Sequence, residues 1–340
     1  MPVSSFSVQS LNDVRALLKS LPGPNQGALA RAIKREPQLT KPPGSLGRLE
    51  ELSHWLAAWQ GRHPPQIINA RTQVFAGNHG VTCKGVSAYP SAVTEQMVGN
   101  FQAGGAAINQ VCQTFNITLK VDAMELNNPT ADFTEGPAMS EPETIKSICH
   151  GMDQVEEGLD ILCLGEMGIG NTTSAAAICH ALYGGNAADW TGPGTGVEGE
   201  AMSAKTYLVA EAVKTHNCND GLDVLMCLGG RELAAIVGAV IAARLKAVPV
   251  MLDGYVCSAA ASVLEATIPG ALDHCKVGHA SSEPGHRLLL ERINQNPLID
   301  FEMRLGEASG AALAVSLLKA AVACHNGMAT FAEAGVSDKA

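Results

Sequence analysis

One segment gives the clearest signal of the fold: Ile161-Leu162-Cys163-Leu164-Gly165-Glu166-Met167-Gly168-Ile169-Gly170-Asn171-Thr172-Thr173-Ser174-Ala175-Ala176-Ala177. Its apolar start predicts a buried strand, its glycines predict a loop, and its alanines predict a helix that the preceding hydroxyl side chains can cap. A strand, a loop and a helix in this order form the repeating unit of α/β folds. The segment therefore predicts an α/β protein.

Similar units recur on both sides of this segment. Short runs that favour strands alternate with segments of helical periodicity, and each run ends in a loop that contains Gly, Asn or Ser. The predicted strands are residues 73–76, 117–123, 161–165, 224–228, 248–252 and 275–279. This alternation predicts a mostly parallel sheet with right-handed crossovers, whose ligands bind in the loops at the carboxyl ends of the strands.

The two ends of the chain favour helices instead. Apolar residues recur at helical spacing in residues 11–18 and 49–59, and an alanine-rich helix is predicted for residues 310–325. Between the first two helices, Lys41-Pro42-Pro43-Gly44-Ser45-Leu46-Gly47-Arg48-Leu49-Glu50 breaks the chain before Ser45 or a neighbour caps the next helix. We expect residues 1–65 and 309–340 to form a small helical domain beside an α/β domain of residues 66–308.

The composition narrows the possible partners. The formal charge of −10 at pH 7 and the lack of a Lys/Arg cluster argue against a nucleic-acid partner. One phosphate remains compatible with this charge, because backbone N–H groups at helix N-termini can bind it. The ten cysteines are scattered without a C-x-x-C pair, and most lie in apolar segments, which favours reduced, buried thiols.

Neither a signal peptide nor a membrane segment is predicted. Residues 1–12 lack the basic region and apolar stretch of a signal peptide. The best apolar run, residues 234–243, is too short to span a membrane and is flanked by charged side chains. We expect a cytoplasmic protein.

The glycine loop after residues 161–165 has the features of an anion site. Free N–H groups, the positive end of a helix dipole and the absence of bulky side chains allow a phosphate to approach. Asn171 and Thr172 lie at the predicted helix start. An ordinary capped turn is the alternative, but Glu166 favours a functional site, because a carboxylate in this loop has no evident packing role.

A second loop, Gly192-Pro193-Gly194-Thr195-Gly196-Val197-Glu198-Gly199, contains a formal G-x-G-x-x-G pattern. It follows a polar stretch rather than a strand, so the context required for NAD binding is missing. A flexible or phosphate-proximal loop is the better interpretation, with Lys205 in the following helix.

Three further positions carry weaker signals. Gly230 lets the backbone approach a ligand, and Asp253 can orient a ribose hydroxyl or a positively charged neighbour, although ordinary turns explain both. Ser281 or Ser282 can cap a helix that starts near Pro284 and so add a second anion-binding helix terminus.

The histidines near these loops do not indicate a metal site. His274, His279 and His286 match no zinc-binding pattern, so solvated or core-edge side chains are expected. We expect neither a metal ion nor an organic cofactor.

Glu307 lies where a loop meets a helix of small residues, in Arg304-Leu305-Gly306-Glu307-Ala308-Ser309-Gly310-Ala311-Ala312. A flat ligand can lie against such a helix beside the carboxylate, but an acidic residue that only stabilises a helix N-terminus gives the same pattern. Glu166 and Glu307 are more suggestive together than alone. Tyr89 and Met97 offer an aromatic and a soft apolar wall for a planar ring.

These segments, in this order, resemble the nicotinate-nucleotide:dimethylbenzimidazole phosphoribosyltransferases of cobalamin nucleotide-loop assembly. The matching motifs are residues 41–50, His79-Gly80-Val81, Gly165-Glu166 with Asn171-Thr172-Thr173, Leu252-Asp253-Gly254, and residues 304–307 with Ser309-Gly310-Ala311-Ala312. The first and last are highly specific. The resemblance implies a homodimer whose chains each form a doubly wound, Rossmann-like parallel-sheet domain and a small helical domain built from both chain ends.

The resemblance also implies a reaction, in which nicotinate mononucleotide and 5,6-dimethylbenzimidazole give α-ribazole 5′-phosphate, nicotinate and a proton. Glu307 matches the general base, and Glu166 matches a carboxylate that stabilises positive charge on the ribosyl ring. The leaving group is an activated pyridinium, so no metal is required. The expected substrate contacts are Asn171, Thr172, Gly194, Thr195, Lys205 and Ser281 or Ser282 around the phosphate, with Tyr89, Met97, Gly230, Asp253 and Leu305 elsewhere.

Departures from the family pattern concern the base pocket. Asn78-His79-Gly80 stands where members often have Asp-His-Gly, and Tyr89 and Met97 stand where small or amide residues are common. Adenine and other benzimidazoles therefore remain alternative bases. A nucleoside-phosphorylase-like enzyme and a non-catalytic module that binds a nucleotide or a corrinoid precursor are the competing interpretations.

Overall fold

The computed structural model describes residues 8–337, in which five strands form one sheet in the order β2-β1-β3-β4-β5. The strands are β1 (Ala70–Ala76), β2 (Thr118–Ala123), β3 (Ile161–Met167), β4 (Val250–Leu252) and β5 (Cys275–Val277). All neighbouring pairs are parallel, as the alternation of elements predicted. Residues 1–7 and 338–340, which belong to the predicted N-terminal segment and helical domain, lie outside the described residues.

Strand β1 lies between β2 and β3 and pairs with both along its length. Val74 of β1 lies opposite Val121 of β2 on one side and Gly165 of β3 on the other. The chain therefore runs outward from β1 to β2 and returns to β3 on the opposite side. Open α/β sheets commonly bind ligands beside such a switch in direction.

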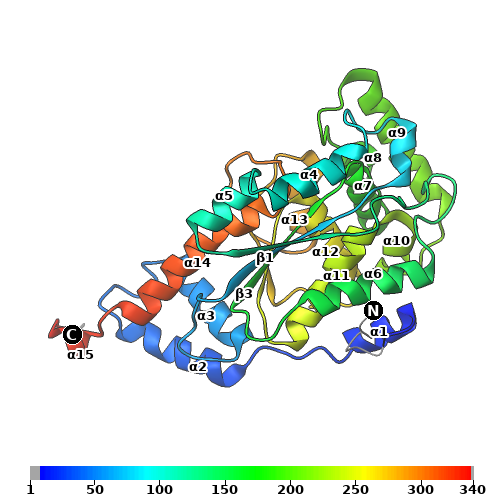
Figure 1. The fold of residues 1–340 in the computed structure, drawn as a ribbon. Helices are drawn as coiled ribbons and strands as arrows, with labels where there is room; N and C mark the ends of the chain where they lie inside the picture. Colours follow the sequence, from blue (N-terminus) through cyan, green and yellow to red (C-terminus); the bar gives the residue numbers. More distant parts are fainter. Residues whose placement is uncertain (1–7, 338–340) are drawn as a thin grey trace.

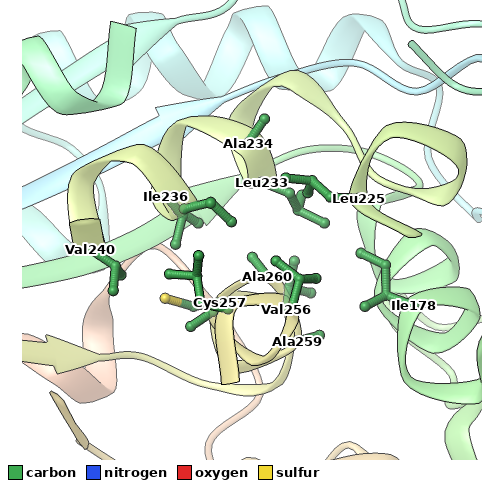
Figure 2. Packing of buried hydrophobic residues seen from close by; sticks show 14 of the residues in the cluster. Ile178, Leu225, Leu233, Ala234, Ile236, Val240, Val256, Cys257, Ala259 and Ala260 are labelled. Carbon is green, nitrogen blue, oxygen red and sulfur yellow. The ribbon is translucent and has the colours of Figure 1, made fainter. Parts of the chain in front are cut away.

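One face of the sheet is covered by the larger apolar core. α6 (Glu141–Gln154), α11 (Arg231–Leu245) and α12 (Tyr255–Thr267) pack there, with α7 (Asn171–Tyr183) and α10 (Gly221–Leu228) against α12. Figure 2 shows side chains of α11, such as Ile236, facing Val256 and Cys257 of α12. α11 is buried along almost its whole length because its residues are apolar on every side.

The other face carries a second core. α3 (Arg48–Gln60), α5 (Ala107–Thr114) and α14 (Ser309–Gly327) pack on it, and α4 (Ala92–Gln102) lies beside β2. Helices thus cover both faces of the sheet, which is the predicted doubly wound arrangement.

The two ends of the chain meet on this second face. α2 (Gln26–Arg35) and η1 (Glu36–Gln38) pack near α3, and Leu39 pairs with Thr330 just before α15 (Phe331–Ala334). Figure 1 shows α14, in red, beside α3, in blue. Both ends therefore contribute helices to one group, as expected.

α1 (Leu11–Leu18) does not join that group. Its apolar side chains belong to the larger core, and Arg15 forms ion pairs with Asp220 and Asp223 around the start of α10. The division of the chain at residues 65 and 308 remains a prediction, and α1 packs on the α/β side of it.

The remaining elements lie in the segments that follow the carboxyl ends of the strands. They are η2 (Gly80–Lys84), α8 (Ala187–Trp190), α9 (Gly199–Thr215) and α13 (Pro284–Arg292). Within residues 8–337, no helix combines the length and apolar character that crossing a bilayer requires. The apolar run at residues 234–243 is the buried middle of α11.

The predicted strand at residues 224–228 is wrong, because these residues end helix α10. The Asp220 side chain accepts a hydrogen bond from the Asp223 N–H and starts the helix. A run of five apolar residues fits a buried strand and a buried helix equally well, so periodicity alone could not separate them.

The predicted helix caps are also corrected. α7 begins after Gly170 and α13 after Glu283, and neither helix has a side-chain cap, so Ser281 and Ser282 do not cap α13. Likewise, α3 begins after Gly47 without a side-chain cap. Gly170 and Gly47 have φ angles of 94° and 52°, a left-handed conformation that glycine adopts without a steric penalty.

Candidate active site

A cavity of about 270 Å³ lies at the carboxyl ends of β3, β4 and β5. The loops that follow these three strands supply most of its wall, as the fold class predicts. Its lining residues are Tyr89, Glu166, Met167, Gly168, Ile169, Asn171, Thr172, Gly194, Thr195, Gly254, Tyr255, Val256, His279, Ser281, Glu283, Arg304, Leu305 and Gly306.

The structure brings most of the predicted site residues to this cavity. Those in the lining are Tyr89, Glu166, Asn171, Thr172, Gly194, Thr195, Ser281 and Leu305. Glu307 and Asp253 are chain neighbours of lining residues and Lys205 is hydrogen-bonded to one, whereas Met97 and Gly230 are not in the lining. Their contacts show how each relates to the cavity.

Glu307 is held in an uncommon backbone conformation. Gly306, Glu307 and Ala308 have φ angles of 85°, 63° and 63°, although only the first is a glycine. The Glu307 N–H donates a hydrogen bond to the carbonyl oxygen of Glu166, at 3.1 Å. A left-handed non-glycine residue costs about 1 kcal/mol or more, and such conformations cluster at functional sites.

The carboxyl group of Glu307 is suited to proton transfer near neutral pH. Burial raises the pKa of Glu307 to about 7, while the backbone N–H of Ile108 acts in the opposite direction and nearby Asp253 adds to the rise. Its Oε2 atom is buried without a hydrogen-bond partner. A poised carboxylate with one free oxygen can accept a proton from a ligand.

Glu166, at the end of β3, is the second buried carboxyl group. Burial and the neighbouring carboxylates of Asp253, Glu232 and Glu307 raise the pKa of Glu166 to about 8. Its Oε2 accepts a hydrogen bond from Asn171 Nδ2. A positive charge in the cavity would favour the ionised form of Glu166.

Gly306 allows this close arrangement of the two glutamates. A Cβ atom on Gly306 would lie 2.8 Å from Glu166 Oε1, so a larger residue would displace the carboxylate. The close approach of the two segments therefore depends on glycine at this position.

Two cationic groups, Lys205 and Arg304, lie beside the cavity at the loop that contains Gly192 and Gly194. Lys205 Nζ donates hydrogen bonds to Thr172 Oγ1 and to the Gly192 carbonyl oxygen, both at 2.9 Å. Burial lowers the pKa of Lys205 to about 8. Arg304 Nη1 donates to the Gly194 carbonyl oxygen at 3.0 Å. These groups suit a phosphate, because charge-assisted hydrogen bonds to oxyanions are strong.

Glu283 was missed by the sequence reasoning. It accepts a hydrogen bond from the Gly194 N–H at 2.9 Å, and its Oε2 atom is buried without a partner. Burial raises the pKa of Glu283, and nearby Lys205 opposes that rise. The sequence signal for Glu283 is a carboxylate directly after Ser281 and Ser282, in the loop after β5. Arg304 and His279 also line the cavity without having been predicted as site residues.

Asp253 contacts α14 rather than the cavity. Its Oδ1 accepts hydrogen bonds from the N–H groups of Gly310 and Ala311, at 2.8 and 3.0 Å, and lies 3.5 Å from His279 Nε2. Asp253 therefore fixes the start of the helix that follows Glu307, and acts on the site through that helix.

Known proteins resemble this chain over nearly its whole length. The model of the family described as phosphoribosyltransferase matches residues 21–336. The nicotinate-nucleotide–dimethylbenzimidazole phosphoribosyltransferase of Sinorhizobium medicae is 56% identical over 98% of this chain and 99% of its own. The enzyme of the same name from Ruegeria sp. is also 56% identical, over 97% and 98% of the two chains.

The chain belongs to the nicotinate-nucleotide–dimethylbenzimidazole phosphoribosyltransferase family. A solved structure of this family, from Thermus thermophilus, superimposes with a TM-score of 0.85 at 39% identity. It covers 93% of this chain and is itself matched along 100% of its length. The family resemblance seen in the motifs is therefore confirmed over nearly the whole chain.

In this phosphoribosyltransferase, the residues predicted to contact the ring of the base do not all lie at the cavity. Tyr89 lines the cavity and is 55% exposed, so it lies at the rim. Met97 packs against the second apolar core from α4. Gly230 precedes α11, where a Cβ atom would lie 2.4 Å from the ring of His79. Of these three residues, only Tyr89 lines the cavity.

Proposed function

We propose that this chain transfers ribose 5-phosphate from nicotinate mononucleotide to 5,6-dimethylbenzimidazole, giving α-ribazole 5′-phosphate and nicotinate in cobalamin biosynthesis. The names of relatives at 56% identity support this reaction. The observation that carries the mechanism is the pair of buried carboxyl groups, Glu166 and Glu307, whose backbones are joined by the hydrogen bond from the Glu307 N–H to the Glu166 carbonyl oxygen.

Glu307 is the proposed general base. One ring nitrogen of the benzimidazole attacks the anomeric carbon, and the other nitrogen must lose its proton. A carboxylate with a pKa of about 7 and an unpaired buried oxygen can accept that proton at neutral pH.

Glu166 is the proposed electrostatic partner of the ribosyl ring. Nicotinate mononucleotide brings a positively charged pyridinium, which favours the ionised form of Glu166 and draws its pKa down from about 8. As nicotinate departs from the face opposite the attacking base, positive charge moves onto the ribosyl ring. A preorganised carboxylate stabilises that charge, and the configuration is inverted.

The phosphate of the substrate is proposed to lie in the part of the cavity beside Lys205 and Arg304. Thr172, Gly194 and Thr195 line this part of the cavity. Lys205 donates a hydrogen bond to Thr172, and Arg304 donates one to the Gly194 carbonyl oxygen. Ser281 lines the same cavity from the loop after β5, and its Oγ accepts a hydrogen bond from the Glu283 N–H. Glu283 holds the Gly194 N–H in the described structure, so phosphate would compete with a carboxyl group for this donor.

Incubation with nicotinate mononucleotide and a panel of bases, with the products identified by mass, tests the function. Product is expected with 5,6-dimethylbenzimidazole. Adenine and other benzimidazoles are the alternative bases, because Asn78 and the exposed Tyr89 at the rim depart from the family pattern. A failure of every base to yield a ribosylated product contradicts the proposal.

The same assay separates the competing classes. A nucleoside-phosphorylase-like enzyme would release a base in response to inorganic phosphate, with Glu307 as a proton donor. A non-catalytic module would bind nicotinate mononucleotide without releasing nicotinate. Nicotinate release that depends on the added base favours the proposed transferase over both.

The assembly and location are also proposals. We propose a homodimer of two-domain chains, divided at residues 65 and 308, acting in the cytoplasm with small-molecule substrates. Light scattering coupled to size-exclusion chromatography should give a mass twice that of one chain, which is 35.3 kDa. The mass of a single chain at micromolar protein concentration would contradict the dimer.

A further inference from the structure

A group of polar side chains, of which Glu36 and His325 are buried and His54 is partly exposed, lies where the two ends of the chain meet. It joins Glu36 of η1, His54 of α3 and His325 near the end of α14. Glu36 Oε2 lies 2.6 Å from His325 Nδ1 and 3.6 Å from His54 Nε2. Glu36 and His325 are 7% and 2% exposed. Three segments that are distant in sequence therefore direct donor atoms toward one point.

From this geometry, we propose that Glu36, His54 and His325 bind a structural Zn²⁺ ion that joins the N-terminal and C-terminal helices. Imidazole nitrogen and carboxylate oxygen are common zinc ligands. One donor atom from each residue lies within 4.8 Å of the others. Ligands about 2.0–2.1 Å from a tetrahedral zinc ion lie about 3.3 Å apart, so shifts of about 1–1.5 Å would place the three protein ligands, and a water molecule would take the fourth position.

An unpaired atom favours a metal over a simple hydrogen-bonded cluster. His54 Nε2 is buried and has no hydrogen-bond partner, although the Glu36 carboxylate is close by. A buried polar atom without a partner is costly, and a bound cation would satisfy it.

The surrounding groups resemble the outer contacts of metal ligands. Lys41 Nζ lies 3.0 Å from Glu36 Oε1 and 2.6 Å from Glu50 Oε1, so the other oxygen of Glu36 stays directed toward the histidines. His63 Nε2 lies 3.1 Å from His325 Nε2, where it can accept a hydrogen bond if Nδ1 of His325 binds the metal. Such outer contacts orient metal ligands.

The proposed site is separate from the catalytic cavity. It lies 16 residues along α14 from Ser309, which is about 24 Å at the rise of an α-helix. The neighbouring Arg35 donates hydrogen bonds to the carbonyl oxygens of His325 and Met328, so α2 and the end of α14 are already fastened there. The ion would therefore stabilise the joint between the chain ends, whether or not the proposed reaction is correct.

The test measures zinc binding to the full chain without an affinity tag. Zn²⁺ is titrated in competition with a chromophoric chelator, and the metal content is measured after dialysis. One equivalent is expected, with a rise in melting temperature on the order of a few °C. Co²⁺ in place of Zn²⁺ should give the visible absorption of a four-coordinate site, which identifies the geometry without any variant.

Matched variants locate the ion. His54→Gln and His325→Gln should each weaken zinc binding at least tenfold and abolish the rise in melting temperature. His180→Gln, at the end of α7, should bind like the native chain. Circular dichroism and nicotinate release show whether each variant is folded. Failure of the native chain to bind one equivalent, or equal binding by the double variant His54→Gln/His325→Gln, overturns the proposal.

Discussion

At the level of single residues, Glu307 combines three properties that a catalytic base requires. Its backbone is left-handed, its N–H is bonded to the Glu166 carbonyl, and its side chain is buried with one unpaired oxygen. The left-handed backbone and the unpaired buried oxygen cost stability, and the surrounding packing must compensate for them. The sequence of residues 304–312 does not by itself require a left-handed backbone or an unpaired carboxylate oxygen at Glu307. We therefore attribute both features to a role in catalysis.

Glu307→Gln should reduce turnover by about 10²- to 10⁴-fold, because an amide of similar shape cannot accept the proton of the base. Steady-state nicotinate release measures this effect, and calorimetry should show that the affinity for nicotinate mononucleotide changes only a few-fold. Glu291→Gln, at an exposed position of α13, is the control and should behave like the native chain. Unchanged turnover in Glu307→Gln would rule out the base assignment.

The same substitution should stabilise the protein at high pH. The folded pKa of Glu307 is raised to about 7, so the folded state holds this proton more tightly than the unfolded state. The tighter binding of the Glu307 proton stabilises the folded state fully below the unfolded pKa, and this stabilisation is lost as the pH rises through the folded pKa of about 7. Glutamine avoids that loss.

Melting temperatures of the native chain and Glu307→Gln should therefore be similar near pH 5, diverge as the pH rises to about 7, and differ by a constant amount above pH 7, with the variant more stable. Glu291→Gln again serves as the control. A difference between the native chain and Glu307→Gln that does not depend on pH would show that burial does not raise the pKa of Glu307.

At the level of elements, the position of α14 against β3 sets the geometry of the site. A Cβ atom on Gly165 would lie 2.2 Å from the backbone nitrogen of Ala308. Asp253 holds the start of α14 from the end of β4. The two glutamates are thus placed by contacts between elements rather than by their own loops.

Gly165→Ala should push α14 away from β3, destabilise the protein by about 1–3 kcal/mol and displace Glu307. A displacement of about 1 Å can reduce the rate on the order of 10²-fold. Chemical denaturation and nicotinate release measure the two effects. Gly99→Ala in α4 is the control, because a Cβ there has no atom within 4 Å. Native-like activity in Gly165→Ala would show that this contact does not position the base.

At the level of the whole molecule, the helices from both chain ends close over one face of the sheet (Figure 1). Glu36, His54 and His325 lie at their junction, and the cavity lies at the carboxyl edge of the sheet. A chelator should therefore change the stability of the junction without changing the reaction in the cavity.

Excess EDTA should lower the melting temperature of zinc-loaded protein while leaving nicotinate release largely intact at temperatures well below melting. The physical reason is that the leaving group is an activated pyridinium and the proposed ion is remote from it. Differential scanning calorimetry and product analysis in the same samples measure both effects. Strict dependence of product formation on metal would contradict the proposed mechanism.

The sequence alone determined the features that depend on local signals. Five of the six predicted strands, the helical chain ends and the glycine loops follow from periodicity and from turn residues. Most predicted site residues also reached one cavity, because loops at the carboxyl ends of parallel strands converge at one edge of the sheet. The motifs in these loops were sufficient to indicate the family.

Only the tertiary structure decided which distant side chains meet. Residues 224–228 became a helix, Asp253 bound α14, and Glu283 entered the cavity. The cluster of Glu36, His54 and His325 spans 289 positions of sequence and follows no spacing pattern. The periodicity of a strand indicates which of its faces is buried, but it does not indicate which other segment of the chain packs against that face. Contacts between remote segments, and the pKa shifts that burial causes, arise only when the chain packs.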